Sequence, residues 1–499
     1  MLKRNLIANY IGQAWSALMG LAFVPLYIKY LGIEAYGLIG LFATLTAWFS
    51  LLDLGMTPTL SREMSRFTAG SLSLEGIRDL LRSIEVITFA ITLAIAGALV
   101  LSANWVATSW LRSSSLPIHD VRQAVAIMGL VGALRFAEMI YLSSILGLQR
   151  QVLFNIVNST FSALRSLGAV GVLAIVSPTI QAFFLWQAIL SPFSLISFAA
   201  ITYSSLPSIK RGARFSREAL QDIWRFAGGM LGITFLALLL TQVDKIILSK
   251  LLGLRDFGYY ALASSLANVV YIFVAPITQA FYPKLCEYQA SRRQSLFNRA
   301  YHLAAQLVTV TAGSCSVFII VFGQPFLRLC FQDDQLAAST SNLLRLPVAG
   351  NLINGLMYVP YQAQLAFGWT RLAFNINICA VMLIVPAILV VPPRYGATGA
   401  AWVWSILNLG YLLIAARLVF TRILKNQKSN WYFQDVIKPL LACTSLALTL
   451  KCFVPKPISL TYQVVYYFLV LFLITVTAFL SARLVRLQLI SSLHALTCT

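Results

Sequence analysis

The strongest constraint in this sequence is a segment that occurs twice. Residues 29–37 read KYLGIEAYG and residues 250–258 read KLLGLRDFG, so one Lys, one Leu and two Gly recur at an offset of 221 residues. Gly147 and Gly368 have the same offset. Two matches at one spacing predict a duplicated unit. In a very apolar chain, such a repeat is typical of a two-lobed membrane transporter whose binding site lies between the lobes.

The composition places most of the chain in lipid. Of its 499 residues, 59% are hydrophobic and only 11% are charged, which is too few charges to cover a soluble protein of this size. Because lipid cannot satisfy backbone N–H and C=O groups, the spans must be helices, and the long unbroken apolar runs exclude a transmembrane β-barrel.

We predict an all-α polytopic membrane protein with about 14 transmembrane helices. The predicted spans are residues 8–28, 36–56, 84–103, 121–146, 154–176, 181–203, 226–249, 258–281, 301–322, 343–366, 372–391, 398–418, 436–454 and 462–482. Spans 1–6 would form an N-terminal lobe (1–215) and spans 7–12 a C-terminal lobe (216–425), with spans 13–14 and the tail as a separate C-terminal helix pair (426–499). Six spans per lobe give both lobes the same orientation, which is a parallel repeat.

The net charge of +21 does not indicate a nucleic-acid partner. Most of the 37 Lys and Arg fall in connections predicted on the cytoplasmic side, as the positive-inside rule expects. Lys3 and Arg4 precede the first span and Arg483 and Arg486 follow the last, so both termini are predicted to be cytoplasmic.

No pattern for an enzyme, a cofactor or a metal site stands out. The chain has no GxxxxGK[ST] phosphate loop, its three His are far apart, and its seven Cys include no CxxC pair. No Ser/His/Asp or Cys/His grouping is visible either. We therefore expect no bound cofactor and no catalysis, with any energy coming from an H⁺ or Na⁺ gradient, the membrane potential or the gradient of the substrate.

Charged residues inside spans are the best candidates for a site, because each costs at least ~2.5–3.5 kcal/mol near the centre of a helix. Arg135 and Glu138 share one face of span 4, either as a local ion pair or as part of a cavity. Arg165 lies near the middle of span 5 with no acidic residue within four positions, which favours cavity lining. Arg345, at the start of span 10, reaches either the cavity or the outer interface.

Four further residues are candidates for coupling or gating. Asp244 and Lys245 lie near the outer end of span 7, where Asp244 could bind a coupling cation or close an outer gate. Asp53 and Arg62 lie near the cytoplasmic mouth and are typical of gate or capping residues. Amides such as Asn351 on span 10 suit sugars in a cavity but equally suit hydrogen bonds between packed spans.

The chain resembles the Wzx-type O-antigen and capsular polysaccharide flippases of the multidrug/oligosaccharidyl-lipid/polysaccharide exporter superfamily. The resemblance covers nearly the whole chain through motifs that are individually of moderate specificity but occur in a characteristic order. They are PLYIKYLG (25–32), Tyr36-Gly37, Asp53-Leu54-Gly55 with Arg62, Asp244-Lys245-Ile246-Ile247, Phe257-Gly258-Tyr259-Tyr260 and Tyr395-Gly396-Ala397. A departure is that span 1 has no Arg or Lys between Arg4 and Lys29, which puts any diphosphate contact there in doubt.

The resemblance implies two six-helix lobes around a cavity and alternating access. It implies a lipid-linked oligosaccharide substrate, on undecaprenyl diphosphate, that is moved across a bacterial inner membrane. Arg135, Arg165 and Arg345 are then the candidates for binding the diphosphate or acidic sugars. Membrane lipids surround such a protein, and a polysaccharide polymerase and a chain-length regulator are its candidate partners.

Three other functions remain as alternatives. A flippase for a lipid-linked peptidoglycan precursor is hard to separate from the leading interpretation by sequence. A cation-coupled multidrug exporter would need more acidic residues deep in the cavity than Glu138 alone. A membrane glycosyltransferase or polymerase would need catalytic residues and a larger outer loop than those at about 104–120 and 323–342.

Overall fold

The computed structural model describes residues 2–68, 70, 72–207, 212–453 and 459–488. These residues are helical almost throughout, and twelve of their helices are long and apolar enough to cross a membrane. The prediction of an all-α membrane protein is confirmed. Helices α1 (Leu2–Ala22) and α13 (Asp334–Ala366) coincide with predicted spans 1 and 10 but are not among the twelve, so the count of 14 is not confirmed.

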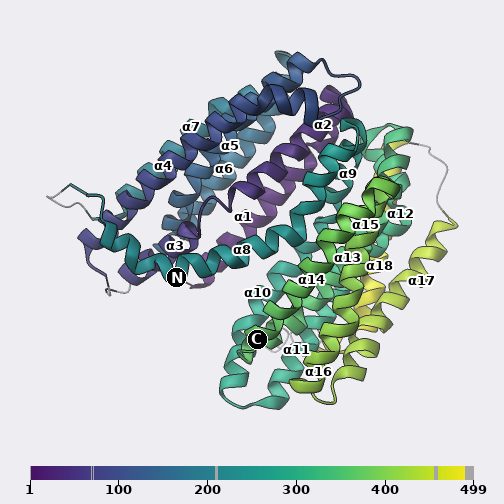
Figure 1. The fold of residues 1–499 in the computed structure, drawn as a ribbon. Helices are drawn as coiled ribbons and strands as arrows, with labels where there is room; N and C mark the ends of the chain where they lie inside the picture. The colour runs from purple at the N-terminus through teal and green to yellow at the C-terminus, as the bar shows by residue number, and fades with distance from the viewer. Residues whose placement is uncertain (1, 69, 71, 208–211, 454–458, 489–499) are drawn as a thin grey trace. The chain divides into compact units, whose positions relative to one another are not determined.

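The chain forms two compact units, residues 1–261 and 262–499 (Figure 1). The first unit contains α1, α2 (Val24–Phe49), α3 (Met56–Thr68), α4 (Leu74–Trp105), the π-helix η1 (Val106–Trp110), α5 (Ile118–Gly147), α6 (Gln151–Ile175), α7 (Ile180–Ser205), α8 (Arg217–Leu251) and the first part of α9 (Leu254–Ala267). This division differs from the predicted lobe boundary at 215/216, because α8 packs on α2, α3 and α4. The predicted lobes stay a prediction.

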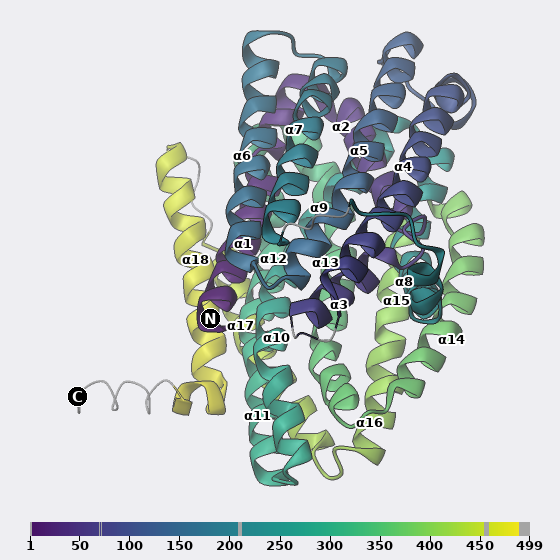
Figure 2. The ribbon, with the colours of Figure 1, turned by 90° about the vertical axis from the view of Figure 1, so that its left-hand side faces the viewer.

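Helix α5 is the centre of the first unit and packs against α3, α4 and α7, while α6 packs against α1 and α7 (Figure 2). Small residues allow this close packing, as is common between membrane helices. A Cβ added to Gly132 of α5 would lie 2.7 Å from the ring of Phe49, and one added to Gly129 would lie 2.6 Å from Leu99. The polar side chains of α5 are therefore held at fixed positions among their neighbours.

The two copies of the repeated segment pack against each other inside the first unit. A Cβ added to Gly258 would lie 2.3 Å from the carbonyl oxygen of Ile33, and one added to Gly37 would lie 2.6 Å from that of Leu254. Ile33 and Leu254 occupy equivalent positions in the repeat, as do the two glycines. Each copy thus presents its glycine to the same carbonyl of the other copy, which is the contact pattern of a two-fold axis.

A carboxylate fixes the loop beside this contact. Glu34 lies in the first copy and is only 5% exposed. It accepts hydrogen bonds from the backbone N–H groups of Ser114 (2.6 Å) and Ser115 (3.0 Å) and from both hydroxyls. The same loop reaches the second copy, because the N–H of Leu254 donates to the carbonyl of Arg112 at 2.8 Å. The loop therefore ties the two copies together.

The structure corrects the second match of the repeat. Helices α5 and α13 end at Gly147 and Ala366, and each is followed by a turn residue with positive φ, Gln149 (57°) and Gly368 (69°). Gly368 therefore corresponds to Gln149 and not to Gly147, which is helical. The turn is repeated, but its register differs from the offset of 221 residues that the sequence indicated.

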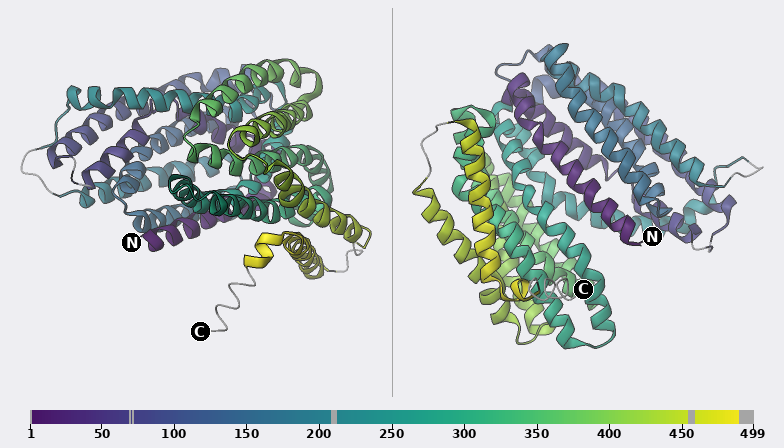
Figure 3. Two further views of the ribbon diagram at one scale, coloured as in Figure 1. Left: turned by 90° about the horizontal axis from the view of Figure 1, so that it is seen from below. Right: turned by 180° about the vertical axis from the view of Figure 1, so that it is seen from behind.

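The second unit is built around α13, which packs on α10, α12 and α15. Its elements are the rest of α9, α10 (Val269–Ala290), α11 (Gln294–Val308), η2 (Thr309–Gly313), α12 (Ser314–Phe331), α13, α14 (Thr370–Val390), α15 (Pro392–Gly410), η3 (Tyr411–Ala415), α16 (Ala416–Arg422), η4 (Asn430–Ile437), α17 (Lys438–Lys451) and α18 (Leu460–Ser481). The pair α17 and α18 packs together and against α12, at the edge of this unit (Figure 3).

A buried polar network holds the final helix pair in place. Asp435 of η4 contacts His302 and accepts a hydrogen bond from Gln306 Nε2 at 2.8 Å. Gln306 Oε1 in turn accepts from the backbone N–H groups of Leu484 (2.8 Å) and Val485 (3.4 Å), just after α18. One amide on α11 therefore joins the beginning of span 13 to the end of span 14.

We expect Gly258→Ala to lower stability by about 1–3 kcal/mol, because the new methyl group meets backbone that cannot move aside cheaply. Thermal unfolding of the purified protein in detergent measures this. Gly232→Ala is the matched control, since nothing lies within 4 Å of its added Cβ on α8. Equal unfolding temperatures for the two variants would show that the glycine contact is not close.

We expect Gln306→Leu to lower stability by about 1–3 kcal/mol for each buried group it leaves unpaired, because an apolar side chain cannot replace its hydrogen bonds. The same unfolding experiment measures the loss. Gln294→Leu is the control, because Gln294 is exposed and donates to Asn298 at 2.9 Å. A stability unchanged from the wild type would contradict the role of Gln306.

Candidate functional site

Two helices of the first unit bring three charged side chains together. Arg165 Nη2 on α6 donates to Glu138 Oε2 on α5 at 3.1 Å and to Ser194 Oγ at 3.0 Å. The side chains of Arg165 and Glu138 are only 17% and 5% exposed. Arg165 therefore has an acidic partner, although the sequence has no acidic residue within four positions of it. Its partner lies on another helix, where spacing along one helix cannot reveal it.

Arg135 lies one turn before Glu138 but has its own partners. Its Nη2 donates to Gln187 Oε1 on α7 at 3.0 Å, and its guanidinium carbon lies 5.4 Å from the ring centroid of Phe42 on α2. Gln187 Nε2 also donates to the carbonyl of Arg165 at 3.3 Å. Gln187 therefore forms hydrogen bonds with both arginines. The sequence analysis missed this role. Gln187 and Ser194 are seven residues apart, on one face of an apolar helix, and this spacing was a usable signal.

This cluster carries one more positive than negative charge. It contains two guanidinium groups and one carboxylate, and the Nε atoms of both Arg135 and Arg165 are buried without a hydrogen-bond partner among the described residues. Uncompensated charge inside an apolar bundle is costly, so such groups face a ligand or water in most membrane proteins. Within the described residues, the cluster therefore keeps a net positive charge and two guanidinium N–H groups without a hydrogen-bond partner.

The corresponding region of the second unit is uncharged. Asn408 on α15 accepts a hydrogen bond from Asn354 Nδ2 on α13 at 2.7 Å. Asn351, on α13 like Asn354, accepts hydrogen bonds from Trp404 Nε1 at 2.8 Å and from the Tyr271 hydroxyl at 3.3 Å. The sequence left open whether these amides bind sugars in a cavity or form hydrogen bonds between packed helices. The structure shows hydrogen bonds between packed helices.

The third predicted arginine belongs to the second unit. Arg345 is exposed on α13, and no hydrogen bond or ion pair of its side chain occurs within the described part of the chain. The structure thus joins Arg135, Glu138 and Arg165 into one cluster, and Arg345 remains a predicted site residue.

Asp53 precedes α3 and Arg62 lies within it. Asp53 is 5% exposed, and both of its oxygens accept from the backbone N–H of Thr57 at 3.0 Å, which caps the helix. Burial raises the pKa of the Asp53 carboxyl, while the bonds from Thr57 act in the opposite direction. Arg62 is half-exposed, with its Nε 3.7 Å from Glu63. Their roles in gating stay predictions.

Asp244 and Lys245 do not form a close pair on α8. Asp244 accepts a hydrogen bond from the hydroxyl of Tyr260 on α9, and Lys245 Nζ donates to the carbonyl of Thr241 at 2.7 Å. The distance between Lys245 Nζ and Asp244 Oδ1 is 3.9 Å. The contact of Asp244 links α8 to α9, whereas that of Lys245 stays within α8. Coupling through Asp244 stays a prediction. Nowhere in the described residues do three or more His, Cys, Asp or Glu side chains form a group that could hold a metal ion.

Curated proteins similar to this chain include two with polysaccharide-related names. A protein named as an O-antigen transporter of Shigella flexneri is 20% identical over 406 residues, covering 81% of this chain and 94% of that protein. The teichuronic acid biosynthesis protein TuaB of Bacillus subtilis is 23% identical over 308 residues, covering 60% and 61% of the two chains.

Solved structures share the fold. The lipid II flippase MurJ has a TM-score of 0.67 at 16% identity and covers 94% of this chain and 97% of its own. A MATE family multidrug resistance transporter has a TM-score of 0.61 at 13% identity, covering 82% and 96%. The chain is thus a multi-pass membrane protein with a MATE-like fold.

Two family models match the sequence. The MatE model matches residues 230–390. The model described as polysaccharide biosynthesis protein matches residues 2–289, more than half of the chain. The chain belongs to this polysaccharide biosynthesis protein family.

Proposed function

We propose that this chain translocates an oligosaccharide repeat unit linked to undecaprenyl diphosphate from the inner to the outer leaflet of a bacterial inner membrane. The product would be O-antigen, capsule or exopolysaccharide. The proposal is supported by the family, by the O-antigen transporter and teichuronic acid relatives, and by the shared fold with a lipid II flippase.

The cluster of Arg135, Arg165 and Glu138 is the observation that carries the proposal. A diphosphate is the one strongly charged part that all lipid-linked substrates of this class share. Arginine suits it because a planar guanidinium donates two parallel hydrogen bonds to phosphate oxygens. The buried Nε groups and the net positive charge of the cluster favour such an anion.

The proposed mechanism is alternating access without chemical catalysis. Two lobes, residues 1–215 and 216–425, would rock about a cavity that includes the arginines of the cluster and Arg345. Asp53 and Arg62 would act at the cytoplasmic mouth and Asp244 and Lys245 at the outer end, with an H⁺ or Na⁺ gradient as the energy source. Both termini would be cytoplasmic, and a polymerase and a chain-length regulator would receive the product.

The net charge of the cluster separates this proposal from cationic drug export. An excess of positive charge repels a cationic drug, and the only carboxylate of the cluster is already paired with Arg165. A lipid-linked peptidoglycan precursor also carries a diphosphate, so only its sugar and peptide distinguish it. The direct test therefore has to offer both lipid-linked substrates.

We expect proteoliposomes that contain the protein to expose the sugar of added undecaprenyl-diphosphate oligosaccharide on the opposite face, as measured by lectin binding. Arg165→Ala should abolish this exposure and remove polymer from the cell surface. Arg165→Lys keeps the positive charge next to Glu138 but cannot donate two parallel hydrogen bonds. Transport should therefore fall although the amount of protein in the membrane is unchanged.

Arg122→Ala is the matched control, because Arg122 is exposed near the beginning of α5 and lies outside the cluster. Wild-type transport by Arg165→Ala would rule out the role of the cluster. Exposure of a peptidoglycan precursor alone would replace the proposed substrate with the alternative one.

We expect Glu138→Gln to lower the free energy of unfolding by about 3–5 kcal/mol, because it leaves buried guanidinium charge uncompensated. The double variant Glu138→Gln/Arg165→Gln should recover part of this loss, since it removes the pair together. Thermal unfolding in detergent measures both variants. A single variant as stable as the wild type would mean that water or lipid already neutralises Arg165.

A further inference from the structure

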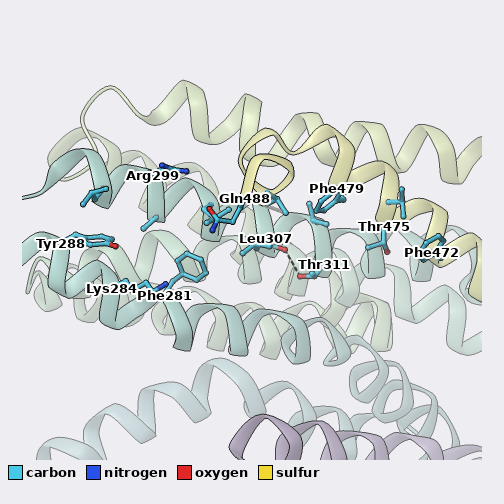
Figure 4. A pocket seen from close by; sticks show the side chains of 16 residues that line it. Phe281, Lys284, Tyr288, Arg299, Leu307, Thr311, Phe472, Thr475, Phe479 and Gln488 are labelled. Carbon is cyan, nitrogen blue, oxygen red and sulfur yellow. Dashed lines mark hydrogen bonds between the residues drawn. The ribbon is translucent and has the colours of Figure 1, made fainter. Parts of the chain in front are cut away.

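A groove in the second unit lies away from the charged cluster. It has a volume of about 940 Å³ and is lined by residues of α10, α11, η2 and α18 and by the chain just after α18 (Figure 4). Helix α18 belongs to the pair that lies outside the predicted repeat. The groove is therefore formed where that pair meets the repeated helices, and the first unit has no counterpart of α18.

The body of the groove is apolar. Leu307, Phe472 and Phe479 are typical of its lining. The two hydroxyls along it are already used, because Thr311 Oγ1 donates to the carbonyl of Leu307 at 2.9 Å and Thr475 Oγ1 donates to that of Leu471 at 2.8 Å. No polar group in this part requires water, so the groove suits a hydrocarbon chain.

One end of the groove is cationic. Lys284, Tyr288 and Arg299 line it there together with Gln488, whereas Phe472 lies at the other end (Figure 4). Within the described residues, no carboxylate lies within ion-pairing distance of either cation. Lys284 Nζ lies 5.7 Å from the centroid of the Phe281 ring. The pattern is that of a site for an amphipathic anion.

The length of the groove matches one leaflet. Arg299 and Thr311 are twelve residues apart on α11 and η2, which is about 18 Å at 1.5 Å per residue. Half of a hydrocarbon core of about 30 Å is about 15 Å. A headgroup at Arg299 would thus place its acyl chain along the groove to about the middle of the bilayer.

We propose that this groove binds an anionic phospholipid of the inner leaflet, with its phosphate at Lys284 and Arg299 and an acyl chain between α11 and α18. This inference rests on the proposed function in one respect. The proposed topology places the connection between α10 and α11 on the cytoplasmic side, and therefore places the headgroup in the inner leaflet. Basic pockets between membrane helices on that side are typical sites for anionic headgroups.

The abundance of phospholipid favours it over the transported substrate as the occupant. Occupancy follows the ratio of lipid concentration to dissociation constant, and phospholipid forms the bilayer itself. Because α18 and the chain after it line the groove, the bound lipid would hold the final helix pair against α11. It would act together with the hydrogen bonds from Leu484 and Val485 to Gln306.

The test uses the full chain purified in a neutral detergent with dioleoylphosphatidylglycerol and dioleoylphosphatidylcholine in equal amounts. Native mass spectrometry counts the lipids that stay bound. We expect one phosphatidylglycerol per chain in preference to phosphatidylcholine, and at least a tenfold loss of this binding in Lys284→Gln/Arg299→Gln. Both side chains are exposed, so this variant should fold.

The matched control is Arg292→Gln/Arg293→Gln, which removes the same charge from the same connection without touching the groove. It should retain the lipid, and Thr475→Trp, which fills the groove but keeps both cations, should release it. Equal loss in the control would reveal unspecific attraction and overturn the proposal. Displacement of phosphatidylglycerol by an equimolar polyprenyl diphosphate would also overturn it, in favour of the transported substrate.

Discussion

A charged or amide side chain inside an apolar helix bundle usually finds its partner on a neighbouring helix, because lipid supplies none. This constraint explains most of the contacts that fix the two units. In the first unit Glu138 pairs with Arg165 across α5 and α6, and Gln187 on α7 holds Arg135. In the second unit, amides and a buried His–Asp contact serve the same purpose. Polar residues thus position the helices as much as apolar packing does.

The two units satisfy their buried polar side chains with different partners. On α7 the first unit has Gln187 bound to a guanidinium, and on α15 the second has Asn408 bound to an amide. An amide pair satisfies itself and needs no further ligand. The arginine cluster leaves charge and N–H groups unsatisfied among the described residues. The two units therefore differ in charge at these helices, with the arginines in the first and amides in the second.

The sequence predicted the helical class, the duplication and the charged residues of the cluster. It did not predict that Arg165 pairs with Glu138, because partners on different helices have no fixed spacing along the chain. It also misaligned the turn at Gly368. A turn residue with positive φ need not be glycine, and Gln149 adopts the same conformation in the first unit. The sequence thus identified residues whose spacing along a single helix is informative. It did not identify pairs that form only when different helices pack together.

The carboxylate of Glu138 gives the cluster a property that two arginines alone would not have. A transporter has to release its substrate, so binding must be strong enough to capture the substrate and weak enough to let it leave. At 4 Å and an effective dielectric constant of 20, each unit-charge contact is worth about 4 kcal/mol before desolvation. Glu138 is 3.1 Å from Arg165. Under the proposed function it would compete with the substrate phosphate for this guanidinium. A captured diphosphate would thus displace an existing partner, which lowers its net affinity and makes release on the far side possible.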